Sequence, residues 1–133
     1  MCHFSFYSFL YKFFDRIKRV IDAEKFIWSR FGYGGTLDNV SELIDTSIII
    51  IDYKNARKPK IDAWIEEYFT QVSGYAMAYY ERTGKICNTA EIWIANELDD
   101  KPQIFKMTSD DIKHYYIEFR KRLNVFNNKF KTI

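Results

Sequence analysis

The stretch Ile48-Ile49-Ile50-Ile51-Asp52-Tyr53-Lys54 decides the fold, because four consecutive isoleucines run directly into Asp-x-Lys. A short apolar run of this kind is typical of a buried strand, in which side chains alternate between the two faces of the sheet. Asp52 and Lys54 therefore lie on one face and Tyr53 on the other. Since charged groups are costly to bury without partners, an acid and a base at the end of a buried strand indicate a functional site.

The preceding strand supplies a second acid. Residues 35–43 have the pattern of a strand, and the turn around Asp45 leads into the isoleucine strand. In a hairpin centred there, residues whose numbers sum to about 90 face each other, which places Asp38 opposite Asp52. Two carboxylates about 4–5 Å apart repel each other, so we expect that one is protonated or that a cation lies between them.

Oxygen ligands at a strand end favour Mg²⁺ or Mn²⁺ over zinc. The two carboxylates would bind the metal, and the backbone carbonyl of Tyr53 is a candidate third ligand. Lys54 would lie beside the metal, where its ammonium can hold an attacking water or stabilise charge at a phosphorus centre. This set of groups is suited to phosphodiester hydrolysis.

The rest of the chain predicts one α/β domain over residues 1–133. We expect a helix, three antiparallel strands, a crossover helix, one or two strands and a final helix. These elements are expected at residues 4–23, 25–31, 35–43, 47–54, 63–82, 88–97, 103–107 and 108–127. The order predicts a mixed central sheet flanked by helices.

Local signals mark the helix ends. Asp62 is a candidate N-cap and Gly84 a candidate C-cap of the helix at 63–82. Thr108, with an acid three residues later, begins the last helix as a capping box. Gly74 lies inside the helix at 63–82, where glycine costs about 1 kcal/mol. We expect it to mark close packing of this helix against the sheet.

Composition excludes several classes of protein. With 20 basic and 18 acidic residues, net charge alone predicts no polyanion binding, so any nucleic-acid surface must come from local clustering. Cys2 and Cys87 are too few and too far apart for a disulfide framework or a structural zinc site, and they indicate a reduced, intracellular compartment. No apolar run is long enough to span a membrane. The acid-free start before Asp15 leaves a mitochondrial presequence as an alternative to a cytoplasmic location.

The motifs resemble those of a known family. Asp38, followed after thirteen intervening residues by Asp52-Tyr53-Lys54, resembles the signature of the PD-(D/E)xK nuclease superfamily. Gln71-Val-Ser-Gly-Tyr75 is similar to the Gln-x-x-x-Tyr motif of its RecB-like branch. The sequence around both motifs is similar to the sequences of phage exonucleases and mitochondrial genome maintenance exonucleases, over roughly residues 10–125. The resemblance implies a restriction-endonuclease-like αβββαβ core and a role in DNA replication, repair or recombination.

The resemblance also implies a site, residue by residue. Asp38 and Asp52 would be metal ligands, Lys54 the catalytic lysine, and Gln71 and Tyr75 catalytic residues that orient Lys54 or touch the scissile phosphate. Glu24 matches an acidic position that relatives often carry near the metal.

Two departures from the family are visible. Relatives usually carry an upstream helix whose histidine or glutamate completes the site, and this chain begins too late to include it, which indicates an N-terminal truncation. Asn55-Ala56 stands where relatives often have Thr-Ser. The four cysteines of the iron–sulfur relatives are absent, so no cluster is expected.

For several residues beside the site, the sequence is compatible with either a DNA-binding role or a purely structural one. Arg57, Lys58 and Lys60 either contact DNA phosphates or solvate a loop. Tyr33 and Trp64 either stack on unpaired bases or pack in the core and its rim.

The leading hypothesis is a metal-dependent DNA nuclease, an exonuclease acting on single strands or DNA ends. The alternative is a catalytically degenerate nuclease-fold domain that binds DNA or a protein partner without cutting. A third is an interaction domain with no role in nucleic-acid chemistry.

Overall fold

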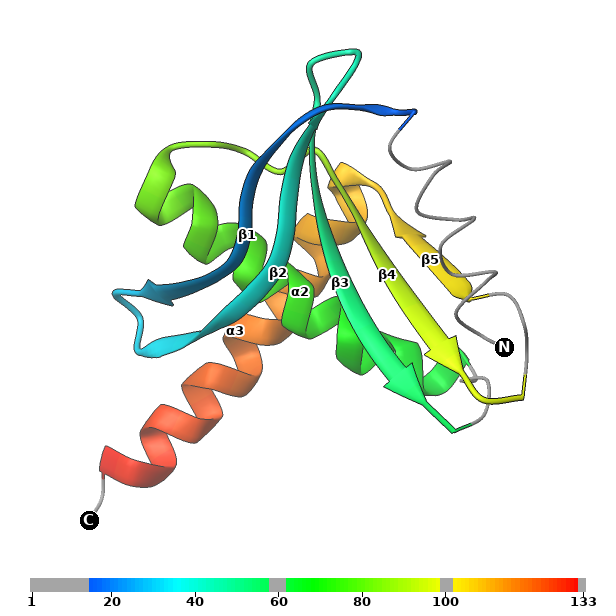
Figure 1. Ribbon diagram of the computed structural model, residues 1–133. Coiled ribbons are helices and arrows are strands. Elements are labelled where there is room, and N and C mark those ends of the chain that lie inside the picture. The colour runs from blue at the N-terminus through cyan, green and yellow to red at the C-terminus, as the bar shows by residue number, and fades with distance from the viewer. Residues whose placement is uncertain (1–14, 58–61, 99–101, 132–133) are drawn as a thin grey trace.

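The computed structural model describes residues 15–57, 62–98 and 102–131, and Figure 1 shows a sheet with its helices packed on one face. No helix in these ranges is both long and apolar enough to cross a bilayer. The elements in chain order are β1 (Ile17–Ser29), β2 (Tyr33–Leu43), β3 (Ile48–Ala56), α2 (Asp62–Thr83), β4 (Thr89–Asn96), β5 (Gln103–Met107) and α3 (Ser109–Lys131).

The five strands form one mixed sheet in the order β1-β2-β3-β4-β5. The first three strands are antiparallel, β3 and β4 are parallel, and β5 returns antiparallel to β4. Because parallel neighbours need a crossover, α2 connects β3 to β4 across the sheet. The predicted register of the hairpin between β2 and β3, in which paired residue numbers sum to about 90, is confirmed. Asn39 pairs with Ile51 and Glu42 with Ile48. The predicted mixed α/β architecture is therefore confirmed.

The prediction of a helix over 4–23 is wrong for residues 17–23, which belong to β1, and residues 4–14 lie outside the described ranges. The pairing of β1 with β2 shifts register between Ile17 and Arg19 and again between Val20 and Asp22. These irregularities interrupt the alternation of a strand. The apolar residues then recur at spacings of three and four, which imitates a helix.

Two of the predicted helix ends are confirmed, the end of α2 at Gly84 and the start of α3 at Thr108, whereas the N-cap role of Asp62 stays a prediction and α3 continues past residue 127 to Lys131. Gly84 follows α2 with φ +76° and donates its N–H to the carbonyl of Tyr80 at 2.7 Å. At the start of α3, Thr108 N–H donates to Asp111 Oδ2 at 2.8 Å, and Asp111 N–H donates to Thr108 Oγ at 3.1 Å. This reciprocal pair is the capping box that the sequence predicts.

The isoleucines of β3 alternate between two apolar clusters, as a strand requires. Ile50 packs with Val40 of β2 and with Val72, Ala76 and Tyr79 of α2. Ile49 and Ile51 pack with Trp93 in a separate cluster. Asp52 and Lys54 continue the face of Ile50, so β3 presents both charged side chains to the side of the sheet that α2 covers.

Gly74 packs against α3, which corrects the expected contact with the sheet. A Cβ at this position would lie 2.9–3.0 Å from ring atoms of Phe119. The edge of Tyr33 packs on the same Phe119 ring, with centroids 4.5 Å apart. The missing side chain of Gly74 therefore lets α2 and α3 approach each other.

Gly74→Ala is expected to lower the free energy of unfolding by about 1–3 kcal/mol, because overpacking against Phe119 outweighs the gain in helix propensity. Denaturant unfolding would measure the change. In a Phe119→Ala background the same substitution should become neutral or stabilising. Stabilisation by Gly74→Ala in the otherwise unchanged protein would contradict the close contact.

Candidate active site

Two acids meet where β2 and β3 stop pairing. The last ladder pair is Asn39 with Ile51. Beyond this pair, a side chain takes over the role of a backbone acceptor. Oδ2 of Asp38 accepts a hydrogen bond from the N–H of Tyr53 at 2.7 Å. This contact places Asp38 beside Asp52, whose ionisation it opposes both by its charge and by a side-chain hydrogen bond. The predicted juxtaposition of the two acids is present.

Asp52 is the buried member of the pair, with 5% of its surface exposed. Burial raises the pKa of Asp52, the Lys54 ammonium lowers it and Asp38 raises it, and together they bring that pKa from 3.8 to about 6. The carboxylate is therefore held in an environment that disfavours its charge. A bound cation would relieve this cost.

Lys54 connects the acids of the sheet to α2. Its Nζ lies 3.1 Å from Asp52 Oδ2 and donates to Gln71 Oε1 at 3.0 Å. Gln71 Nε2 in turn donates to the hydroxyl oxygen of Tyr75 at 3.3 Å, one turn further along the helix. The structure thus links Asp38, Asp52, Lys54, Gln71 and Tyr75 in one series of contacts. Their roles in catalysis stay predictions.

The donor set fits a small divalent cation. Asp52 Oδ2 is buried and makes no hydrogen bond, although Lys54 lies within ion-pair distance. Tyr53 turns its N–H toward Asp38, and a strand residue directs its carbonyl to the same side as its N–H. Two carboxylates and a carbonyl are oxygen ligands of the kind that Mg²⁺ and Mn²⁺ prefer.

The sequence predicted Glu24 directly before the first strand, whereas the structure places it elsewhere. It lies within β1 at φ 49°, between the pairs Ala23 with Asn39 and Lys25 with Leu37. Its side chain is exposed. Over the described part of the chain, no group of three acidic, histidine or cysteine side chains suited to a metal occurs, so Glu24 does not form one with the two acids. Its role as a ligand stays a prediction.

The basic loop after β3 is only partly described. Arg57 is exposed, whereas Lys58 and Lys60 lie outside the described residues, as does the side chain of Trp64. Tyr33 is half-buried, and its hydroxyl donates to the carbonyl of Gly74 at 2.9 Å. The sequence left open whether Tyr33 stacks on bases or packs within the protein, and in the structure it packs within the protein.

Sequence reasoning missed two residues of this site. The first is Tyr68 of α2, because Lys54 Nζ lies 5.1 Å from its ring centroid, within cation–π range. Its spacing of three residues from Gln71 on one helix face was the available signal. The second is Gly35 of β2, which lies directly against Tyr75. A Cβ there would lie 2.9 Å from two ring carbons of Tyr75 and closer still to its hydroxyl oxygen.

Under the nuclease hypothesis from the sequence, Gly35→Ala is expected to displace Tyr75 and to lower kcat/KM for DNA by about 10-fold, because small misplacements in a site are costly. Steady-state cleavage together with thermal melting would separate this effect from unfolding. In a Tyr75→Phe background the penalty in melting temperature should shrink, since the closest atom is gone. Full activity in Gly35→Ala would show that the position of Tyr75 does not matter.

Comparison with known proteins identifies the fold. No protein-family model and no curated protein matches the chain. Among solved structures, it resembles the crystal structure of a "putative exonuclease" from Eubacterium rectale, with a TM-score of 0.56 and 15% sequence identity. The match covers 89% of this chain and 48% of the other, so this chain spans about half the length of that protein. The mixed five-stranded sheet with its helices is thus consistent with the restriction-endonuclease-like nuclease fold that the sequence predicts.

Proposed function

We propose that the chain is a metal-dependent DNA nuclease, and specifically an exonuclease that acts on single strands or DNA ends. The observation that carries the proposal is the unbroken series of contacts from Asp38 through Asp52 and Lys54 to Gln71 and Tyr75. A purely structural hairpin has no need of a buried carboxylate with a raised pKa beside a lysine held from a helix.

Asp38, Asp52 and the Tyr53 carbonyl would hold Mg²⁺ or Mn²⁺. When bound, the metal supplies Lewis-acid polarisation of a phosphoryl oxygen and acidifies a bound water. The protein's own contribution is to fix these oxygens at the end of a rigid sheet.

Lys54 is placed to act on the same phosphate. An ammonium has three N–H donors. One is used by Gln71, and Asp52 lies on another side at 3.1 Å, so a third remains for a water or a phosphate oxygen. Gln71, supported by Tyr75, keeps the ammonium from turning away. Positive charge fixed in advance is the form of catalysis that phosphoryl transfer most uses.

The choice of DNA and of exonuclease action rests on two supports. The motifs resemble those of RecB-like nucleases, and the Eubacterium rectale protein of similar fold is described as a "putative exonuclease".

The direct test is cleavage of end-labelled single-stranded and duplex DNA with Mg²⁺ or with EDTA, beside a closed circular single strand. We expect Mg²⁺-dependent shortening from an end and no cutting of the circle. Asp52→Ala should reduce the rate by on the order of 10³-fold. Glu42→Gln is the matched control, because Glu42 is an acid of β2 that pairs with Arg19 outside the site. Activity that survives Asp52→Ala would refute the proposal, and binding without any product would favour the degenerate alternative.

A further inference from the structure

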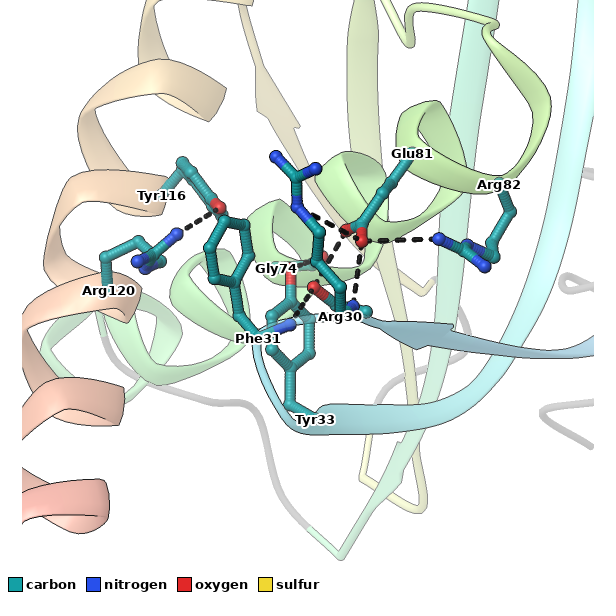
Figure 2. Close-up of polar contacts among 9 residues, drawn as sticks. Arg30, Phe31, Tyr33, Gly74, Glu81, Arg82, Tyr116 and Arg120 are labelled. Carbon is teal, nitrogen blue, oxygen red and sulfur yellow. Dashed lines mark hydrogen bonds and ion pairs between the residues drawn. The ribbon is translucent and has the colours of Figure 1, made fainter.

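The end of β1 and the turn that follows it carry exposed aromatic rings, with arginines from the turn, α2 and α3 around them. We call the set Trp28, Arg30, Phe31, Arg82 and Arg120 the arginine–aromatic surface. Trp28 is 49% exposed and Phe31 is 37% exposed, although both are large and apolar. Figure 2 shows Arg30 and Phe31 of the turn between Arg82 of α2 and Arg120 of α3.

The guanidinium groups stack on the rings. Arg82 Cζ lies 3.7 Å from the ring centroid of Trp28, and Arg120 Cζ lies 3.8 Å from that of Phe31. Planar cations at this distance hold a ring in place by cation–π attraction. Because half of Trp28 remains exposed, Arg82 leaves part of the indole open to a further planar group.

Glu81 fixes the turn to α2 (Figure 2). Its carboxylate accepts the Ser29 hydroxyl and the Arg30 N–H, both at 2.8 Å. It also pairs with Arg82 at 3.3 Å and with Arg30 at 3.9 Å. The rings are therefore presented from a braced turn, which reduces the entropy lost when a ligand binds.

The surface carries excess positive charge. Three arginines meet one carboxylate, that of Glu81. Within the described ranges Arg120 pairs with no acid; its Nη1 donates to the Tyr116 hydroxyl at 3.3 Å, and its buried Nε has no hydrogen-bond partner. Since the chain as a whole is nearly neutral, this is the kind of local clustering that anion binding requires.

Strand β2 connects this surface to the candidate active site. Tyr33, directly after the turn, bonds to Gly74 of α2, and Gly35 touches Tyr75. Asp38 follows three residues after Gly35. From Tyr33 to Asp38 the strand spans about 17 Å, at roughly 3.4 Å per residue. A stacked single strand covers that distance with about five nucleotides.

We propose that the arginine–aromatic surface binds single-stranded DNA and leads it to the acids at the end of β3. Bases stack on the exposed part of Trp28, Phe31 holds the guanidinium groups of Arg30 and Arg120 over its ring, and the arginines contact the phosphates. Exposed rings select unpaired bases, because the faces of paired bases are covered by their neighbours. The direction toward a cleavage site rests on the proposed nuclease function, whereas binding itself does not.

The test measures binding separately from cleavage. A fluorescein-labelled thymidine oligonucleotide about 20 nucleotides long would be titrated in EDTA and followed by anisotropy, beside a blunt duplex of equal length. We expect Trp28→Leu combined with Phe31→Leu to weaken single-strand binding by about 10-fold or more, and Trp28→Tyr to retain it. Arg120→Gln should weaken binding and flatten its salt dependence.

Matched controls come from the opposite end of the sheet. Arg19→Gln removes an exposed arginine and Ile44→Ala an exposed apolar side chain, and neither should change binding. Melting temperatures check that each variant is folded. Binding that is unchanged in the double leucine variant, or wild-type binding that is equal for the duplex, would overturn the proposal.

The two proposals fail differently. Binding that depends on Trp28 and Phe31, without any Mg²⁺-dependent product, supports the surface and refutes the nuclease. If the protein cleaves DNA but substitutions at Trp28 and Phe31 leave DNA binding unchanged, the result supports the nuclease function and refutes the role of the arginine–aromatic surface.

Discussion

Asp52→Asn is expected to raise the free energy of unfolding of the metal-free protein by about 2–3 kcal/mol above pH 6, and to leave it nearly unchanged well below pH 4. The cause is the buried carboxylate, whose pKa is raised from 3.8 to about 6, chiefly by burial. Each unit of pKa corresponds to about 1.4 kcal/mol of preference for the neutral form. An asparagine fills the same space without a charge to bury.

The sign follows from proton binding. Well below pH 3.8 Asp52 is protonated in both the folded and the unfolded chain, so its ionisation costs nothing. Between the two pKa values the folded state holds the proton that the unfolded state has lost, and stability falls as pH rises. Above pH 6 both states are ionised, and the full cost of burying the charge is present.

Chemical denaturation of both proteins across this pH range would give the difference curve. Asp45→Asn is the control with the opposite sign, because hydrogen bonds from Ser47 lower the pKa of that exposed carboxyl. Its loss should destabilise the protein at neutral pH, with the difference disappearing as pH falls through the pKa. A flat difference curve for Asp52→Asn would mean that Asp52 is not buried with a raised pKa.

Adding millimolar Mg²⁺ extends the same experiment. A metal that binds the ionised carboxylates stabilises the folded protein by mass action, and increasingly so as pH rises past 6. The wild-type melting temperature should therefore rise with Mg²⁺ above pH 6, and that of Asp52→Asn should not. An equal metal effect in both proteins would place the metal elsewhere.

The parts of the site that could be predicted from the sequence follow local rules. The alternation of strand side chains placed Asp52 and Lys54 on one face of the sheet, and a hairpin centred on Asp45 placed Asp38 opposite Asp52. Both inferences need only the pleat of a strand and the length of a turn. The spacing of Gln71 and Tyr75 on one helix face is equally local.

The parts that could not be predicted depend on contacts between distant segments. Residues 17–23 form a strand because β2 pairs with them through two register shifts. These shifts cannot be predicted from the local sequence pattern. Gly74 meets Phe119 only because α3 crosses α2 there. Glu81 has the sequence context of an ordinary helix-end acid, and its role appears only once the turn at Arg30 lies against it.

Lys54→Met is expected to lower kcat by on the order of 10³-fold, because it removes the charge placed to stabilise the transition state while keeping the length of the side chain. Lys106→Met is the matched control, since Lys106 is an exposed lysine of β5. Single-turnover cleavage at saturating Mg²⁺ would measure the chemical step. A loss confined to KM would instead assign Lys54 to binding.

Gln71 tests whether Lys54 works through its orientation. Gln71→Leu removes the acceptor that holds Nζ at 3.0 Å, and kcat should fall by roughly 10–100-fold. In a Lys54→Met background the same substitution should cost little more, because a residue that acts through another has no effect once that residue is gone. Additive losses in the double variant would mean that Gln71 touches the DNA directly. In that case the contact with Lys54 would be a feature of the DNA-free protein, and Gln71 would have to leave Lys54 when the phosphate arrives.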